Sequence, residues 1–132
     1  MVLVDTSVWI DFIRGRPTAV IDRLRTALDR GVGVALTPAI YQEILQGALD
    51  ERSFRNHRSY FSGQRFLHPL DPVVTYERAA RLYFECRRKG LTIRSSNDCQ
   101  VAQAAIEHGV SLMHDDRDFE QIAKVAPQLK FA

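Results

Sequence analysis

The sequence predicts a three-layer α/β sandwich, in which a mainly parallel central sheet of about five short strands carries helices on both faces. Short apolar runs alternate along the chain with segments whose apolar residues recur at helical spacing, a pattern typical of parallel sheets. Helix-start signals follow directly on the apolar runs, as crossover connections between parallel strands require. The chain has 132 residues, of which 45% are hydrophobic and 26% charged, so we expect one globular domain over residues 1–132.

The first half of the chain contains clear strand and helix signals. Thr6-Ser7 follows the first apolar run and offers an N-cap for a helix. Thr37-Pro38 is a stronger start, because threonine caps free backbone N–H groups and proline suits the first helical position. The expected elements are, in order, strand 2–4, helix 8–13, helix 20–28, strand 32–36, helix 38–48 and helix 52–62.

The second half continues the alternation. Asp71-Pro72 begins a long helix that runs up to Gly90. Gly109 closes the next helix, because glycine readily adopts the left-handed conformation that ends helices. The expected elements are, in order, strand 65–70, helix 72–89, helix 95–108, strand 110–113, helix 118–125 and an edge strand at 128–131.

Acidic side chains stand where an open α/β sheet builds its ligand crevice. Asp5 ends the first apolar strand, and Asp116 follows the strand at 110–113. Glu43 lies just inside one helix, and Asp98 lies in the first turn of another. Parallel strands end at the same edge of a sheet, and the neighbouring helices begin there. We therefore expect these carboxylates to converge.

Converging carboxylates indicate a divalent metal site. Like charges held close together repel and shift toward protonation unless a cation joins them. Ligands that are all oxygen, with no cysteine or histidine cluster, select Mg²⁺ or Mn²⁺ over Zn²⁺. Such a site can activate a water and neutralise the charge that develops on a phosphodiester.

Each carboxylate also has a structural explanation, which the sequence leaves open. Asp98 follows Ser95 at the spacing of a capping box, and an acid there suits the helix dipole. Asp5 could end a strand and open a turn, while Asp116 and Asp118 could cap the last helix. Glu43 is least explained by capping, because it lies beyond the first turn between apolar neighbours.

Charge and cysteine content restrict the function classes further. The net charge is only +2, so a converging acidic site would leave the remaining surface more basic than this total indicates. An acidic, metal-loaded crevice with a basic rim suits a phosphodiester polymer. Neither Cys86 nor Cys99 belongs to a C-x-x-C pair, which argues against a zinc ribbon or a redox motif. We expect both cysteines to be reduced and buried, in a cytoplasmic protein.

Neither a signal peptide nor a membrane span is expected. The N-terminal apolar stretch meets Asp5 almost at once, and the longest uncharged run, residues 31–42, is interrupted by Pro38. The 4 histidines show no metal-ligand spacing. His114, next to the acids, is expected to be structural rather than an RNA contact, and Trp9 is expected in the core.

The acidic residues lie within segments that are recognisable in their order and spacing. These are Asp5-Thr6-Ser7-Val8-Trp9-Ile10, Thr37-Pro38-Ala39-Ile40-Tyr41-Gln42-Glu43-Ile44-Leu45-Gln46-Gly47, Asn97-Asp98-Cys99-Gln100-Val101-Ala102 and His114-Asp115-Asp116-Arg117-Asp118-Phe119. Together they closely resemble the PIN-domain family, and in particular its VapC-type toxin ribonucleases. The resemblance covers essentially the whole chain.

The resemblance implies both a site and an activity. By it, Asp5, Glu43, Asp98 and Asp116 match the family's acidic quartet, and Asp118 matches a commonly present fifth acid. It implies an endoribonuclease that depends on Mg²⁺ or Mn²⁺, forms a homodimer and is neutralised by a VapB-type antitoxin. The chain departs from the family pattern where Asp115 precedes the fourth acid, since a neutral or basic residue is common there.

Two other classes compete with this interpretation. A haloacid-dehalogenase-type phosphatase wants Asp-x-Asp after its first strand, where this chain has Asp5-Thr6-Ser7. A response-regulator receiver needs a phospho-accepting aspartate after its central strand, where residues 32–36 lead instead into Thr37-Pro38. The last alternative is a PIN-like binding module without catalysis, and the filled acidic quartet argues against it.

Overall fold

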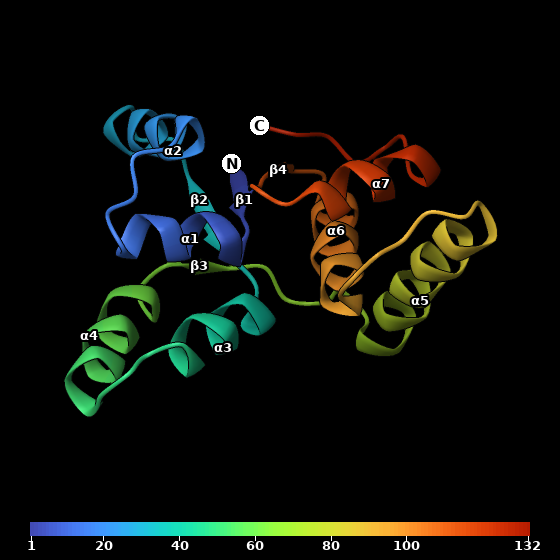
Figure 1. Cartoon of the computed structure of the whole chain (residues 1–132). Helices are drawn as coiled ribbons and strands as arrows, with labels where there is room; N and C mark the ends of the chain where they lie inside the picture. Colours follow the sequence, from blue (N-terminus) through green and yellow to red (C-terminus); the bar gives the residue numbers. More distant parts are fainter.

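The computed structural model describes residues 1–132 as an α/β protein with a central sheet and helices on both of its sides (Figure 1). The elements are β1 (Val2–Val4), α1 (Thr6–Ile13), α2 (Ala19–Asp29), β2 (Val34–Leu36), α3 (Pro38–Gln46), α4 (Glu51–Phe61), β3 (Arg65–Phe66), α5 (Pro72–Arg88), α6 (Ser96–His108), β4 (Ser111–Met113) and α7 (Arg117–Val125). The predicted fold class is therefore confirmed.

The sheet is parallel and has β1 near its centre. Its strand order is β3-β2-β1-β4, and each neighbouring pair is parallel. Leu3 pairs with Ala35 on one side and with Leu112 on the other. A single parallel bridge joins Leu112 to Phe131, so the edge strand predicted at 128–131 is reduced to one bridge beside a four-stranded sheet.

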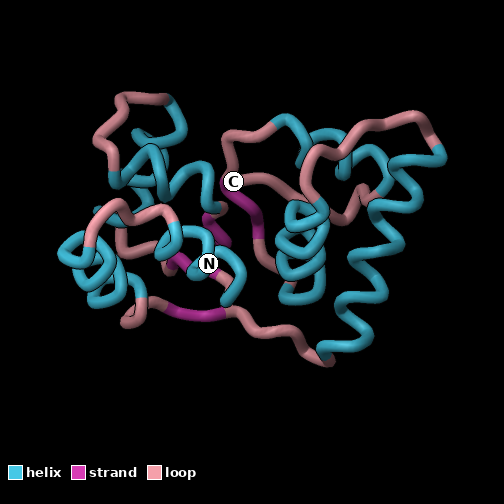
Figure 2. The backbone as a smooth tube through the Cα atoms, turned by 60° about the horizontal axis from the view of Figure 1, so that its bottom comes forward, coloured by secondary structure: helices cyan, strands magenta, loops and turns pink.

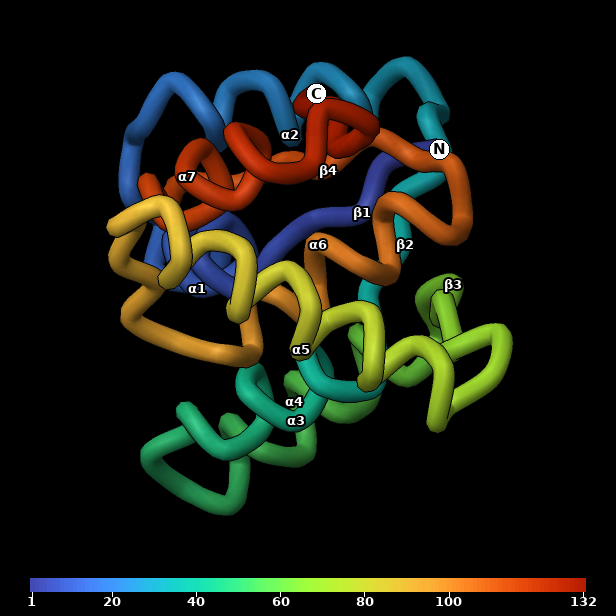
Figure 3. Tube along the Cα trace, turned by 90° about the vertical axis from the view of Figure 1, so that its right-hand side faces the viewer, coloured from blue at the N-terminus to red at the C-terminus, as the bar shows by residue number.

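The helices form two groups around the sheet. Helices α1 to α4 lie on one side of the strands, and α5 to α7 lie on the other (Figure 1 and Figure 2). Seen from the second side, α5 and α6 stand in front of the strands (Figure 3). This arrangement places the starts of α1, α3, α6 and α7 around the carboxyl-terminal edge of the sheet.

Aromatic side chains fill the core under α1. Trp9 is fully buried, and its ring meets those of Phe12 and Phe61 edge-on, with centroids 5.8 and 5.1 Å away. Edge-to-face pairs of this kind are favourable beyond the area that they bury. The prediction that Trp9 belongs to the core is confirmed, and both Cys86 and Cys99 are buried free thiols.

Among the boundaries that differ from those predicted, three have a clear local cause. The N-cap of α1 is Asp5, whose side chain accepts from the Ser7 backbone N–H, rather than Thr6-Ser7. Strand β2 begins later than expected, because the N–H groups of Gly31 and Val32 still donate to carbonyls of α2. Strand β3 ends at Phe66. The Leu67 N–H still donates to Leu36, but proline at position 69 has no N–H to extend the ladder.

No helix has the length and apolar character needed to cross a membrane.

Candidate active site and metal centre

The predicted acidic residues converge at the carboxyl-terminal edge of the sheet. Asp5 follows β1, Glu43 lies within α3, Asp98 lies in the first turn of α6, and Asp116 is the N-cap of α7. The structure brings all of them to one cavity of about 470 Å³. Its lining consists of Asp5, Thr6, Ser7, Ile10, Asp11, Arg14, Arg16, Glu43, Ser95, Asp98, Asp115 and Asp116.

A tighter cluster lies within this group. One carboxylate oxygen from each of Asp98, Asp116 and Asp118 can be chosen so that all lie within 4.8 Å of one another. Asp5 and Glu43 fall outside that three-residue cluster, but their charges still raise the pKa of Asp98. Asp118 is buried and does not line the cavity, so it supports the site from beneath.

Asp98 is the carboxylate of the site with a buried oxygen, Oδ2, that lacks a hydrogen-bond partner. Burial, followed by repulsion from Asp116 and other site acids, raises the pKa of Asp98 to about 8. The Ser95 hydroxyl accepts from the Asn97 N–H at 3.3 Å, and Asp98 makes no reciprocal capping contact, so the capping-box explanation of Asp98 is wrong.

Asp5 is held rigidly by its neighbour. Its Oδ2 atom accepts from the Ser7 hydroxyl at 2.7 Å and from the Ser7 N–H at 3.1 Å. Burial nevertheless raises the pKa of Asp5, because the loss of hydration outweighs these hydrogen bonds. Half-buried Glu43 also has a raised pKa, first through burial and then through repulsion from Asp5. Neither carboxyl forms an ion pair within the protein.

Asp116 is at once a cap and a member of the cluster. Its Oδ1 atom accepts from the Asp118 N–H at 3.0 Å, which caps α7, and from the Arg94 guanidinium at 2.8 Å. The Asp116 N–H donates to His114 Nδ1 at 3.1 Å. The capping explanation for Asp116 is therefore confirmed, and the same residue also belongs to the acidic cluster.

His114 has the structural surroundings that the sequence analysis expected. Its ring packs against those of Phe119 and Phe131, with centroids 5.1 and 4.6 Å away. Burial lowers the pKa of His114, so the neutral ring that accepts from Asp116 is the favoured form.

The donor set of the cavity fits a hard divalent cation. All of the converging side chains offer oxygen, and no histidine or cysteine joins the cluster. The buried, unpaired Oδ2 atom of Asp98 provides an oxygen with no competing partner. The pKa of Asp98 is raised first by burial and then by the charges of the neighbouring acids, both of which a bound cation would offset.

Comparisons with known proteins agree with this geometry. The PIN domain model matches residues 2–125. The chain belongs to the PIN-domain family. It is 35% identical over 126 residues to the VapC ribonuclease Mb1587 of Mycobacterium bovis and to the ribonuclease VapC11 of Mycobacterium tuberculosis, covering 95% of this chain and 93% of each relative.

Solved structures confirm the fold of this PIN domain. The VapBC2 structure of Rickettsia felis, bound to a promoter DNA fragment, superposes with a TM-score of 0.76 at 19% identity, over 100% of this chain and 98% of that chain. The VapBC-1 structure of nontypeable Haemophilus influenzae gives a TM-score of 0.75 at 20% identity, over 100% and 97% of the two chains.

Arg94 is the residue of this PIN domain's site that sequence reasoning missed. It lies between α5 and α6, directly before the α6 N-cap, and contacts both Asp116 and Asp118. No periodicity or motif spacing points to an arginine in a connection. The only available signal was its position beside Ser95, at the start of a helix that carries a site acid.

Proposed function

We propose that this PIN domain is an endoribonuclease that depends on Mg²⁺ or Mn²⁺, and that it is the toxin of a type II toxin–antitoxin pair. The observation that carries the proposal is the convergence of Asp5, Glu43, Asp98 and Asp116 on one cavity that contains a buried, unpaired carboxylate oxygen. Relatives at 35% identity, which are named ribonucleases, support the same activity.

In this proposal, the acidic quartet holds the cation, with Asp118 as a fifth acid beneath it. Asp98 and Asp116 belong to the tightest cluster, and Asp5 and Glu43 line the same cavity. A bound divalent cation supplies an activated water and neutralises charge on the scissile phosphodiester. The protein contributes preorganisation, because the Ser7 bonds fix Asp5 and the Asp118 N–H fixes Asp116.

The shape and charge of the surroundings suit RNA. Arg14 and Arg16 line the acidic cavity, where a guanidinium can bind a phosphate. A neighbouring hollow of about 330 Å³ shares Asp115 and Asp116 with that cavity and adds two further arginines, Arg23 and Arg117, to its wall. Two adjoining hollows offer an elongated path, as a polymer substrate requires.

A cleavage assay with matched variants tests the activity. Purified protein is incubated with single-stranded RNA and Mg²⁺, and RNA ends are sequenced after brief reaction. We expect discrete cuts by the wild type and none by Asp98→Asn, which removes charge from an acid that makes no side-chain hydrogen bond. RNA binding without cleavage by the wild type would instead favour a non-catalytic binding module.

We also propose a VapB-type antitoxin as the partner. The solved neighbours with the same fold carry the name VapBC, and one is described as a toxin–antitoxin complex from Klebsiella pneumoniae. Exposed apolar side chains on and before α4, namely Leu49, Phe54 and Tyr60, provide a surface for a second protein. Affinity purification from the native cell at endogenous levels should recover a small partner; recovery of free protein alone would contradict this.

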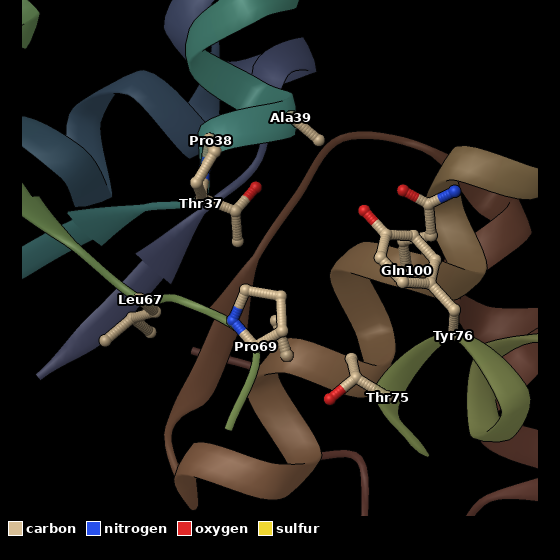
Figure 4. Close-up of a pocket in the computed structure, with 9 residues that line it drawn as sticks. Thr37, Pro38, Ala39, Leu67, Pro69, Thr75, Tyr76 and Gln100 are labelled. Atoms are coloured by element: carbon tan, nitrogen blue, oxygen red, sulfur yellow. The ribbon is translucent and has the colours of Figure 1, made fainter. Parts of the chain in front are cut away.

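We propose a homodimer through the face where α3, α5 and α6 meet. A small cavity of about 60 Å³ lies there, lined by residues of these helices and of the segment after β3 (Figure 4). Beside it, the side chains of Leu70, Val73 and Tyr76 are 69%, 77% and 51% exposed. Exposed apolar side chains that gather into a patch are typical of a protein–protein contact surface.

Sedimentation analysis tests the dimer. Val73→Asp should yield a folded monomer, because it places a charge in the proposed interface. Leu49→Asp is the control, since Leu49 is also apolar and even more exposed, at 98%, but lies between α3 and α4. A wild type that sediments as a monomer at micromolar concentration would exclude the dimer.

We place this activity in the cytoplasm and in a single PIN domain spanning residues 1–132. The buried free thiols Cys86 and Cys99 support a reducing compartment. Fractionation of the native cell, followed by detection of the protein, checks the compartment; detection in an exported fraction would contradict it.

A further inference from the structure

Arg94 makes three contacts with two acids of the site. Its guanidinium Nη2 atom lies 2.8 Å from Asp116 Oδ1, and its Nε atom lies 3.4 Å from Asp118 Oδ1. Its backbone N–H donates to Asp118 Oδ2 at 2.9 Å. The connection between α5 and α6 therefore places both a positive charge and a backbone N–H donor against Asp116 and Asp118.

No other basic side chain forms an ion pair with these acids. The remaining ion pairs of the structure join Arg16 to Asp11, Arg55 to Glu51, and Arg81 and Arg88 to Glu85. Within the cluster of Asp98, Asp116 and Asp118, two members are paired with Arg94, while Asp98 has no such partner. Arg94 is therefore the counter-charge that the chain itself provides.

We propose that Arg94 acts as the internal counter-cation of the site and sets its affinity for the divalent ion. This inference rests on the proposed metal dependence. In the metal-free protein, the guanidinium offsets the repulsion among the acids. When a cation binds, the same positive charge opposes it, so Arg94 weakens metal binding while stabilising the empty fold.

Charge, rather than scaffolding, is what the Arg94 side chain contributes. Asp118 keeps its bond from the Arg94 backbone N–H whatever side chain stands at that position. Asp116 likewise keeps its capping bond from the Asp118 N–H. Removing the guanidinium therefore leaves both carboxylates held in place but changes the local charge by one.

The size of the effect is limited by exposure. The Arg94 side chain is 69% exposed, so water and salt screen its interaction with the acids. We expect a change of about fivefold in metal affinity at low salt, which shrinks as salt is added. The same exposure leaves the guanidinium free to move aside without disturbing the core.

The dissociation constant for Mn²⁺, measured by titration calorimetry, tests the proposal. Arg94→Gln should bind Mn²⁺ about fivefold more tightly than the wild type at low salt and should melt at a lower temperature in EDTA. Arg94→Lys keeps the charge and should bind nearly as the wild type does. Arg78→Gln is the control, because Arg78 is exposed on α5 and forms no ion pair; it should change neither quantity.

The possible outcomes separate this inference from the function on which it rests. A folded Arg94→Gln protein that binds Mn²⁺ as the wild type does, or more weakly, overturns the counter-cation role. Equal tightening by Arg94→Lys and Arg94→Gln also overturns it, since charge would then not be the cause. A wild type that binds no Mn²⁺ at all overturns the proposed metal dependence itself.

Discussion

The hydroxyl of Ser7 donates to Asp5 Oδ2 at 2.7 Å, and the Ser7 N–H donates to the same oxygen at 3.1 Å. This oxygen therefore has two donors from one residue. The Ser7 hydroxyl also accepts from the Asp115 N–H at 3.2 Å, which ties the start of α1 to the segment after β4. One small side chain thus orients an acid and joins two elements of the site.

Ser7→Ala should reduce RNA cleavage by about tenfold, because groups that orient a metal ligand typically contribute ten- to a hundredfold. It should also lower the free energy of unfolding by about 1 kcal/mol, since a side-chain hydrogen bond is lost. Initial cleavage rates and urea unfolding measure the two effects. Ser59→Ala, on the exposed face of α4, is the control and should change neither.

The sequence was sufficient to predict the order of the elements and the convergence of Asp5, Glu43, Asp98 and Asp116. Both follow from local signals, because strand ends and helix starts in a parallel sheet meet at one edge. The Arg94 contacts were not predictable, since they join residues from connections that carry no periodic pattern. The role of Asp116 was left open for a related reason: one carboxylate can cap a helix and face a cavity at once.

Asp98→Asn should raise the melting temperature of the metal-free protein, although it abolishes cleavage. Asp98 makes no side-chain hydrogen bond through its buried Oδ2, so an amide there costs little. The amide also spares the fold the cost of keeping this acid protonated, or of ionising it beside the other acids. Asp116→Asn should stabilise less or destabilise, because Asp116 pairs with Arg94. Thermal melts in EDTA compare the two variants; a larger gain for Asp116→Asn would contradict this ranking.

The stability of the metal-free protein should fall as pH rises toward about 8. The pKa of Asp98 is raised from 3.8 to about 8, so the folded state keeps a proton that the unfolded chain has lost. Ionisation of this side chain in the unfolded chain therefore lowers the stability of the fold progressively between these values, and the loss is complete once Asp98 also ionises in the fold near pH 8. His114 acts oppositely below its usual pKa of 6.5, because its pKa is lowered in the fold.

Melts in EDTA between about pH 7 and about pH 9 isolate Asp98, because His114 is then neutral in both states. The wild type should lose stability as pH rises toward 8, whereas Asp98→Asn should lose markedly less. Equal slopes for the two proteins would show that Asp98 ionises normally in the fold.

Removal of divalent metal should abolish cleavage reversibly. The donor oxygens fit Mg²⁺ or Mn²⁺, and either ion should restore activity after EDTA treatment and dialysis. Zn²⁺ should not be required, since no histidine or cysteine joins the cluster. Mg²⁺ at about a hundred times its dissociation constant should stabilise the wild type by about 2.7 kcal/mol. Full activity in metal-free buffer would reject the mechanism.

Arg14→Gln should weaken RNA binding more than it slows the chemical step. Arg14 lines the acidic cavity and forms no ion pair within the protein, so its charge is available to a phosphate. We expect KM to rise several-fold with little change in kcat, because a phosphate contact holds substrate and transition state alike.

Salt dependence distinguishes a phosphate contact from a structural role for Arg14. Each phosphate contact on a single strand contributes a slope of about −0.7 to the plot of log affinity against log salt concentration. Arg14→Gln should therefore make that slope shallower by about this amount. Arg78→Gln removes an exposed charge on α5, away from the cavity lining, and should leave the slope nearly unchanged. If both variants alter the slope equally, Arg14 acts only through net charge, and its assignment to the RNA path is wrong.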